Sequence, residues 1–165
     1  MKIPQILPAN PRANYLAHQV EIDDAISDVL FAGRYILGDH VRQFEAAFAH
    51  FIGVGHAVGV GSGTEALHLA LRAHNIGPGD AVLTVSHTAV ATVAAIEQAG
   101  AMPELGDVQP GTFCMDPEDA RRTLNAVKRD PSLLGQHTPK AIVPVHLYGH
   151  PVDMASIGAL ADEWN

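Results

Sequence analysis

Segments with the pattern of strands and of helices alternate from residue 56 onward, and this alternation limits the fold more than any other feature of the chain. Each strand-like run is short and rich in aliphatic residues, and a longer run with helical spacing follows it. The expected strands cover residues 56–60, 81–85, 101–108 and 140–149. Nearly unbroken apolar strands that alternate with helices predict an α/β fold with a mostly parallel sheet and flanking helices.

The segment 1–55 precedes this alternation and is expected to be helical. Apolar residues spaced three and four apart predict one helix over 15–33, which Gly33 ends, and Asp39 is expected to cap a second helix. Two later residues are expected N-caps as well: Asp116 and Asp153. We therefore expect an N-terminal helical segment over 1–55 and an α/β domain over 56–165.

The composition excludes several classes of protein. The net charge of −8 gives no support for binding to nucleic acid or to an anionic membrane surface. No apolar run is long enough for a transmembrane helix. Cys114 is the only cysteine, which excludes an internal disulfide and fits a reducing cytoplasm. His146 and His150 are spaced like a metal-binding pair, but Gly149 and Pro151 break any helix that would align them, so no metal site is expected.

The segment 57–71, AVGVGSGTEALHLAL, has glycine at positions 59, 61 and 63, where an expected strand passes into a helix. It lacks the glycine or alanine at position 64 of a dinucleotide-binding loop, and no Gly-Lys-Ser/Thr follows as in nucleotide hydrolases. Two interpretations stay open. In the first, the backbone N–H groups at the helix start and the Thr64 hydroxyl hold a phosphate. In the second, Ser62 and Glu65 form a capping box that only starts the helix.

In a parallel sheet, ligands bind beyond the carboxyl ends of the strands. Three loops are therefore expected to line a site: GSGT after the first expected strand, SHTA after the second and HLYGH after the fourth. His87 lies in the second loop, and it is equally consistent with an ordinary polar loop residue. The aromatic residues Tyr35, Tyr148 and Trp164 are scattered along the chain and do not predict a stacking platform for nucleic acid.

Several motifs occur together from about residue 12 to the end of the sequence: GxGSGTxALxLAL, GPGDxV, HTxVATxxAI and PVHLYG. This combination resembles the N-terminal half of the DegT/DnrJ/EryC1/StrS family, whose members are sugar aminotransferases that depend on pyridoxal 5'-phosphate (PLP) and share the fold of aspartate aminotransferase. The resemblance implies that residues 56–165 are the first part of the PLP-binding domain, which is then truncated at its C-terminus.

The resemblance also implies which residues bind the cofactor. Gly63, Thr64 and Glu65 correspond to the turn that holds the cofactor phosphate, largely through backbone N–H groups. The SHTA loop corresponds to one that lies beside the pyridine ring, and many relatives carry Phe or Trp at the position of Ala89. Because alanine offers no ring, we expect His87 to take the place of that aromatic side chain.

Transamination needs a lysine that forms a Schiff base with the cofactor and moves a proton, and an acid that keeps the pyridine nitrogen protonated. The sequence offers Lys2 near the N-terminus, Lys128 near the end of an exposed helix and Lys140 at the start of a strand, opposite the site. We therefore expect no catalytic residue in this chain. By resemblance to the family, the lysine and the acid are expected beyond Asn165, and the chain alone is expected to be inactive.

For the complete enzyme, the resemblance implies transfer of an amino group from an amino acid, glutamate, to a keto group of a nucleotide-linked sugar in polysaccharide biosynthesis. It implies a cytoplasmic homodimer in which the segment RYILG reaches the site of the partner subunit, so that Tyr35 belongs to a composite site. Two alternatives stay open. One is a truncated remnant without catalytic function, and the other is a PLP-dependent sugar dehydratase or regulator with the same fold.

Overall fold

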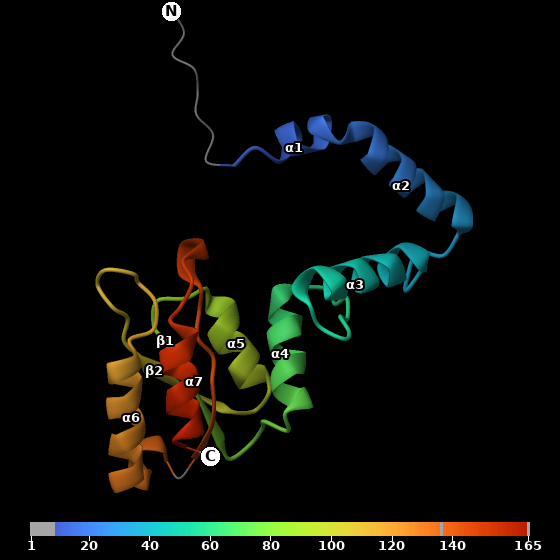
Figure 1. The fold of residues 1–165 in the computed structure, drawn as a ribbon. Coiled ribbons are helices and arrows are strands. Elements are labelled where there is room, and N and C mark those ends of the chain that lie inside the picture. Colours follow the sequence, from blue (N-terminus) through green and yellow to red (C-terminus); the bar gives the residue numbers. More distant parts are fainter. Residues whose placement is uncertain (1–8, 136, 165) are drawn as a thin grey trace, which may run out of the picture. The chain divides into compact units, whose positions relative to one another are not determined.

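The computed structural model describes residues 9–135 and 137–164, and Figure 1 shows their helices and strands. The chain divides into two compact units, residues 1–59 and 60–165. In the described part of the chain, the first unit is helical and the second contains all the strands.

The first unit contains α1 (Pro11–Ala17), α2 (Gln19–Ala32) and α3 (Asp39–Ile52). The sequence predicts one helix over 15–33, but the structure has two, because the backbone of His18 leaves the helical region with φ −124° and ψ 23°. The hydroxyl of Tyr15 donates a hydrogen bond to the Asp23 carboxylate across this break, at 3.0 Å. Gly33 ends α2 in the left-handed conformation with φ 65°, as expected.

The start of α3 corrects the predicted cap. Gly38, with an extended backbone, is the N-cap, and Asp39 is the first helical residue. The carboxylate of Asp39 forms an ion pair with Arg42 one turn further on. A negative charge in the first turn also interacts favourably with the helix dipole. The helix therefore begins where the sequence indicates, but Asp39 contributes its charge rather than a capping hydrogen bond.

The apolar residues of α3 form a stripe that stays exposed within the first unit. The rings of Phe44 and Phe48 stack with centroids 5.6 Å apart, and Phe51 is 82% exposed. Ala49 is the buried residue of this helix. An amphipathic helix normally buries such a face against another surface. Within the described part of its own unit, this stripe lacks that cover.

The second unit is a three-stranded parallel sheet with helices on both faces (Figure 1). Its strands are β1 (Asp80–Val85), β2 (Met102–Gly106) and β3 (Thr138–Ile142), in the order β2-β1-β3. Its helices are α4 (Gly63–Ala73), α5 (Val90–Gln98), α6 (Pro117–Arg129) and α7 (Met154–Asp162), with short 3-10 helices η1 (Pro131–Leu134) and η2 (Leu147–Gly149). The expected α/β class with a parallel sheet is confirmed.

The side chains of the central strand β1 alternate between two cores. Leu83 and Val85 pack with residues of α6 and α7, among them Leu124 and Leu160. On the other face, Val82 packs with residues of α4 and α5 and of the segments that follow them, namely Leu71, Ile76, Ile96 and Ala99. Because successive side chains of a strand point to opposite faces, one buried strand fixes both helical layers.

The two N-caps predicted for this unit, Asp116 and Asp153, are confirmed, and Ser62 caps α4 as in the second interpretation of its turn. The side-chain oxygens of Ser62, Asp116 and Asp153 each accept a hydrogen bond from a backbone N–H group in the first turn of the following helix. The donors are the N–H groups of Glu65, Glu118 and Ser156, at 3.2, 3.0 and 3.1 Å. Each cap satisfies a donor that the helix itself leaves unpaired.

The first predicted strand is wrong, since residues 56–60 form no strand. A strand needs a neighbour that pairs with its N–H and C=O groups, and no strand within residues 9–135 and 137–164 pairs with this segment. Val58 is 80% exposed, and the N–H group of Gly59 donates to the Glu45 carboxylate at 2.7 Å instead. An apolar run of this kind is typical of a strand, but it forms one only where a neighbouring strand pairs with its backbone groups.

The fourth predicted strand, over 140–149, is observed as β3 and ends earlier, at Ile142. The N–H group of Val143 still donates to the Leu83 carbonyl at 2.8 Å. Pro144 has no N–H group to continue the ladder. The chain therefore leaves the sheet at this point and turns into η2, which places the HLYG segment in the loop beyond the strand.

Candidate functional site

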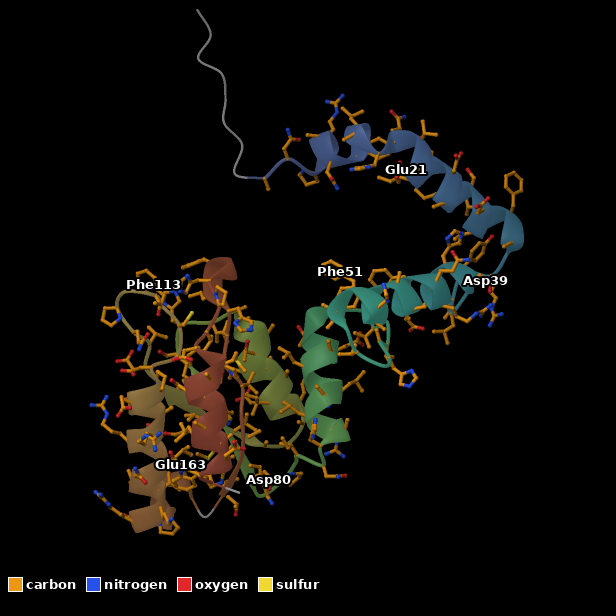
Figure 2. All side chains as sticks on the ribbon, viewed as in Figure 1. Glu21, Asp39, Phe51, Asp80, Phe113 and Glu163 are labelled. Atoms are coloured by element: carbon orange, nitrogen blue, oxygen red, sulfur yellow. The ribbon has the colours of Figure 1, made fainter. Side chains whose placement is uncertain are left out.

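The loops that follow β1, β2 and β3 extend from one edge of the sheet, because the three strands are parallel. Figure 2 shows this arrangement: Phe113, in the loop after β2, lies at the opposite end of the unit from Asp80, where β1 begins. The N-terminal ends of α4 and α5 lie at the same end as Phe113 (Figures 1 and 2). This carboxyl edge is where ligands bind in open parallel sheets.

Three aromatic side chains, one from each loop, meet at this edge. His87 follows β1, Phe113 follows β2 and Tyr148 lies in η2 after β3. The Nε2 atom of His87 and the hydroxyl oxygen of Tyr148 are 3.2 Å apart, within hydrogen-bond distance. The His87 ring stacks on Phe113, with centroids 5.9 Å apart and planes inclined by 30°, and meets Tyr148 edge-on at 6.0 Å and 81°. His87 is thus held on two sides rather than loose in its loop.

Two of these residues have a backbone conformation that is unusual for large side chains. Phe113 has φ 58° and Tyr148 has φ 54°, in the left-handed region. This conformation costs a residue with a Cβ atom about 1–2 kcal/mol. Phe113 closes a tight turn in which its N–H group donates to the Gln109 carbonyl at 2.8 Å. Strained residues of this kind persist only where the surrounding contacts hold them.

Sequence reasoning missed Phe113 and did not connect Tyr148 with His87. It considered the loops after three of the expected strands but left out the loop after residues 101–108, which carries Phe113. Counting the loop after every parallel strand would have found it. Tyr148 appeared to be a scattered aromatic residue, because only the strand order places β3 next to β1.

The turn before α4 is a capped helix start with open space above one glycine. The hydroxyl of Ser62 accepts the N–H group of Glu65, and the N–H group of Ala66 donates to the Ser62 carbonyl at 3.0 Å. The N–H groups of Gly63 and Thr64 precede these bonds in the first turn, where a helix can bind an anion. A Cβ atom built on Gly63 would meet no atom within 4 Å. A ligand can therefore approach the backbone at this point.

The Glu65 carboxylate lies over a different glycine. Its Oε2 atom is 2.6 Å from the position that a Cβ atom on Gly61 would take. Glycine at position 61 therefore makes room for this side chain, while the space at Gly63 remains clear. The backbone N–H group of Glu65 is already bonded to Ser62, so Gly63 and Thr64 are the donors that this turn offers to an anion.

Ala89 and Tyr35 are the remaining predicted site residues. Ala89 is the exposed N-cap residue of α5, with φ −64° and ψ 139°, and its methyl group offers no stacking surface. Tyr35 belongs to the first unit, in the connection between α2 and α3, where it is 66% exposed and lines a groove of about 470 Å³ with residues that include Asp28 and His40.

The described lysines lie away from the carboxyl edge. Lys128 is near the C-terminal end of α6, with Nζ 5.5 Å from the centroid of the Trp164 ring. Lys140 was expected to begin the strand, but β3 begins at Thr138. Lys140 lies within β3, at a bulge opposite Ala81 and Val82, near the start of β1. Lys2 lies outside the described residues. Neither described lysine is therefore close to the edge that holds His87.

Within the described residues, no group of three or more His, Cys, Asp or Glu side chains has the geometry of a metal site. His146 has a structural contact, since its Nδ1 atom accepts the N–H group of Val152 at 3.0 Å. Among the same residues, no helix has the length and hydrophobicity needed to cross a membrane.

The DegT/DnrJ/EryC1/StrS aminotransferase family matches residues 17–165, and the chain belongs to this family. It is 42% identical over 153 residues to the dTDP-3-amino-3,4,6-trideoxy-alpha-D-glucose transaminase of Streptomyces venezuelae, covering 92% of this chain and 37% of that protein. It is 39% identical over 141 residues to the "Pleiotropic regulatory protein" of Geobacillus stearothermophilus, covering 86% and 35%. The chain therefore spans less than half the length of these relatives.

Solved structures confirm the fold. A DegT DnrJ EryC1 StrS aminotransferase from Brucella abortus superposes with a TM-score of 0.90 at 33% identity, over 96% of this chain and 42% of that one. DesV of S. venezuelae, solved in complex with a ketimine intermediate, superposes with a TM-score of 0.88 at 39% identity, over 98% of this chain and 40% of DesV. NtdA of Bacillus subtilis with bound cofactor PMP gives 0.79 at 28% identity, over 90% and 32%.

Proposed function

We propose that this chain is part of a PLP-dependent aminotransferase that transfers an amino group from an amino acid, glutamate, to a keto group of a nucleotide-linked sugar. Family membership supports the reaction class, and the S. venezuelae transaminase, whose name specifies a dTDP-linked amino sugar, supports the substrate class. The observation that carries the proposal is the arrangement of the carboxyl edge, where the N-terminal end of α4 and the loop after β1, which contains His87, lie at the same end of one sheet.

The start of α4 fits the phosphate of the cofactor. The backbone N–H groups of Gly63 and Thr64 and the Thr64 hydroxyl would hold it, with support from the helix dipole. Open space above Gly63 admits the phosphate, and the Glu65 carboxylate lies over Gly61 instead. Glu65 is part of this turn, but its backbone N–H group donates to the Ser62 side chain and is therefore not a donor to the phosphate in this proposal. The cap and the anion site are therefore compatible, since they use different donors.

The loop after β1 fits the ring of the cofactor. His87 would provide a flat surface against the pyridine, and the small Ala89 beside it would leave room for the ring. PLP, when bound, supplies an electron sink that stabilises negative charge on the carbon next to the transferred nitrogen. His87 and Ala89 would orient this ring, while the groups that move protons lie elsewhere.

The lysine that moves the proton and the acid that pairs with the pyridine nitrogen are expected outside these residues. Lys128 and Lys140 lie near the opposite edge of the sheet, where neither can reach the proposed site. The relatives extend well beyond the part that this chain matches. We infer that both groups come from the part of the protein that corresponds to that extension, and that residues 1–165 alone do not transaminate.

We further propose that the complete protein is a cytoplasmic homodimer in which Tyr35 contributes to the partner's site. The exposed stripe of Phe44, Phe48 and Phe51 on α3 is the surface that such an arrangement would cover. The groove beside Tyr35 carries the polar side chains of Asp28 and His40, which suit a polar small-molecule substrate better than an apolar one.

A second candidate function is regulation or sugar dehydration on the same fold. Two relatives have regulatory names, which support this candidate. One is the G. stearothermophilus protein, and the other is a Saccharopolyspora erythraea protein at 42% identity called a "sensory transduction protein". The residue at the expected lysine position discriminates between these functions, because a histidine there would favour dehydration. A truncated remnant without catalytic function would lack both the lysine and the acid.

The test compares binding of PLP and of pyridoxal, which lacks the phosphate, to the longest form of the protein that its gene encodes. Thr64→Val removes a phosphate donor and keeps the shape, so we expect the Kd for PLP to rise about 10-fold and the Kd for pyridoxal to stay unchanged. Thr138→Val, at the start of β3 and the far edge of the sheet, is the matched control. A wild-type protein that binds PLP no better than pyridoxal would contradict the proposed phosphate site.

A coupled measurement tests the reaction. Glutamate added to the PLP-loaded protein should release 2-oxoglutarate and convert the cofactor to pyridoxamine phosphate in a single turnover. A nucleotide-linked keto sugar should then restore PLP and yield the amino sugar. Release of 2-oxoglutarate without any later amination of a sugar would assign the protein to a different class of acceptor.

A further inference from the structure

We propose that Phe113 and Tyr148 are positioning residues that hold the imidazole of His87 as the flat wall of the cofactor site, in place of a ring at Ala89. This inference deepens the proposed function and rests on it. It adds two residues that contact His87 rather than the cofactor, and it explains how a side chain from an exposed loop presents a fixed surface.

The first argument is the number of directions from which His87 is held. A histidine side chain has two rotatable bonds, and two contacts from different sides fix both. Phe113 stacks against the ring, and the Tyr148 hydroxyl lies at hydrogen-bond distance from Nε2. The stacking contact leaves the opposite face of the imidazole as the face for a second flat group. A ring bound there would extend the stack of aromatic surfaces that Phe113 begins.

The second argument is that both holding residues are strained. In the described residues, the non-glycine positions with positive φ are Leu37, Asn75, Phe113 and Tyr148. Asparagine adopts this conformation readily, whereas large side chains do so at a cost. Two of the three positions with large side chains touch the same histidine. Loops selected only for turning the chain would place glycine or asparagine there.

The third argument is that the two loops are tied together beneath these rings. Cys114, next to Phe113, is buried, and its Sγ atom donates to the carbonyl of His150 at 3.4 Å. His150 lies two residues after Tyr148. Across the sheet, Thr84 Oγ1 donates to the Val143 carbonyl at 2.9 Å, which joins β1 to the segment that leads to Tyr148. The three loops therefore form one support, and a change at Phe113 or Tyr148 should act on His87.

The direction of this hydrogen bond is coupled to which nitrogen of His87 carries a proton. A neutral imidazole has one N–H donor and one acceptor nitrogen. If the Tyr148 hydroxyl donates to Nε2, the proton of the neutral ring is on Nδ1. Tyr148 would then fix both the orientation of the ring and the polarity of its free edge. This predicts a signature at His87 that packing alone would not produce.

The experiment uses the full protein that the gene encodes and measures the tautomer of His87 by long-range ¹H–¹⁵N NMR without cofactor. We expect Tyr148→Phe to change the ratio of the two His87 tautomers, because the ring remains and only the hydroxyl is lost. Tyr15→Phe is the matched control, since Tyr15 donates its hydroxyl hydrogen bond to Asp23 in the first unit. It should leave the His87 signals unchanged.

The second readout is the Kd for PLP and for pyridoxal. A residue that supports the flat wall acts on the pyridine ring, which both compounds share. Its loss should therefore weaken the binding of PLP and of pyridoxal to the same extent. We expect about 5-fold weaker binding for Tyr148→Phe and about 2- to 10-fold weaker binding for Phe113→Leu. Phe113→Tyr keeps the ring and should restore the wild-type Kd. Phe31→Leu, at a 92% exposed position of α2, is the control for loss of a phenyl ring.

The outcomes separate this inference from the proposed function. If the wild-type protein binds neither compound, the proposed function fails and the wall has no ligand, although the NMR signature still reports whether Tyr148 orients His87. If the wild type binds PLP and pyridoxal but Tyr148→Phe and Phe113→Leu leave the tautomer and both Kd values unchanged, the positioning role is wrong while the cofactor assignment stands. Circular dichroism of each variant excludes a loss of fold as the cause.

Discussion

The imidazole of His87 and the hydroxyl of Tyr148 meet at 3.2 Å, although the two residues are 61 positions apart in the chain. They meet because β1 and β3 are neighbours in a parallel sheet and both strands end at the same edge. Phe113 joins them from the loop after β2. The meeting point is therefore a property of strand order, and it lies where an open parallel sheet binds ligands.

Gly63→Ala should separate cofactor binding from folding. A Cβ atom at this position meets no protein atom within 4 Å, and alanine favours a helix more than glycine does. The variant should therefore unfold at the same or a slightly higher urea concentration than the wild type. The added methyl group would occupy the space proposed for the phosphate, so the Kd for PLP should rise by at least about 10-fold. Equal PLP affinity in the two proteins would argue against phosphate binding at Gly63.

Replacing His87 should show that a ring, rather than a polar group, is needed there. His87→Ala removes the surface and should weaken binding of PLP and pyridoxal alike, by about 10-fold, since stacked aromatic contacts contribute up to about 1.5 kcal/mol. His87→Phe keeps a flat ring and should retain most of the affinity. Equilibrium dialysis gives both values. If His87→Asn, which is polar but not aromatic, matches the wild type, the stacking role is excluded.

The 165-residue chain by itself should form no covalent adduct of PLP with a specific lysine. Lys128 and Lys140 lie near the amino ends of the strands, away from the proposed site. Spectra of the chain with PLP should therefore lack an absorbance band that depends on one lysine. Lys128→Ala and Lys140→Ala serve as the comparison. An absorbance band that either substitution removed would show that this chain contains its own reactive lysine.

The stability of the second unit should fall in acid partly through Asp153. Hydrogen bonds from the side chain and the backbone of Ser156 lower the pKa of the Asp153 carboxyl below its ordinary value of 3.8. A lowered pKa in the folded state stabilises the fold above the ordinary value, and this gain is lost as the pH falls through the lowered one. Asp153→Asn keeps the cap and removes the charge, so its thermal midpoint should lie below that of the wild type at about pH 7 and approach it in strong acid. A difference that grows as the pH falls would contradict this sign.

A charge on the apolar stripe of α3 should reduce self-association. Phe48→Glu places a carboxylate beside the exposed rings of Phe44 and Phe51, which the proposed homodimer would cover. Sedimentation of the full protein should then show a larger fraction of monomer. Ala46→Glu adds the same charge on another side of the helix and is the control. If both variants associate like the wild type, the dimer does not use this stripe.

Local signals in the sequence were sufficient for several helix starts, but not for all of them. Asp116 and Asp153 cap their helices as predicted, and Ser62 caps α4 as one of the two interpretations of its turn has it, because a short polar side chain can reach N–H groups only within its own first turn. The break at His18 was not predicted, since the apolar spacing continues through it. Asp39 was predicted as the N-cap of α3, but the N-cap is Gly38. Sequence patterns rarely resolve a helix start to within one residue.

The sequence by itself determined the α/β class, the family and the turn at residues 61–65, because these depend on residues that are neighbours in the chain. Only the tertiary structure decided that residues 56–60, which pair with no strand in the described part of the chain, do not form a strand. It also decided that Phe113 and Tyr148 hold His87. Both outcomes depend on which strand lies beside which. A strand needs a partner for its backbone groups, and a ring needs surfaces from other loops, so neither could be read from a local pattern.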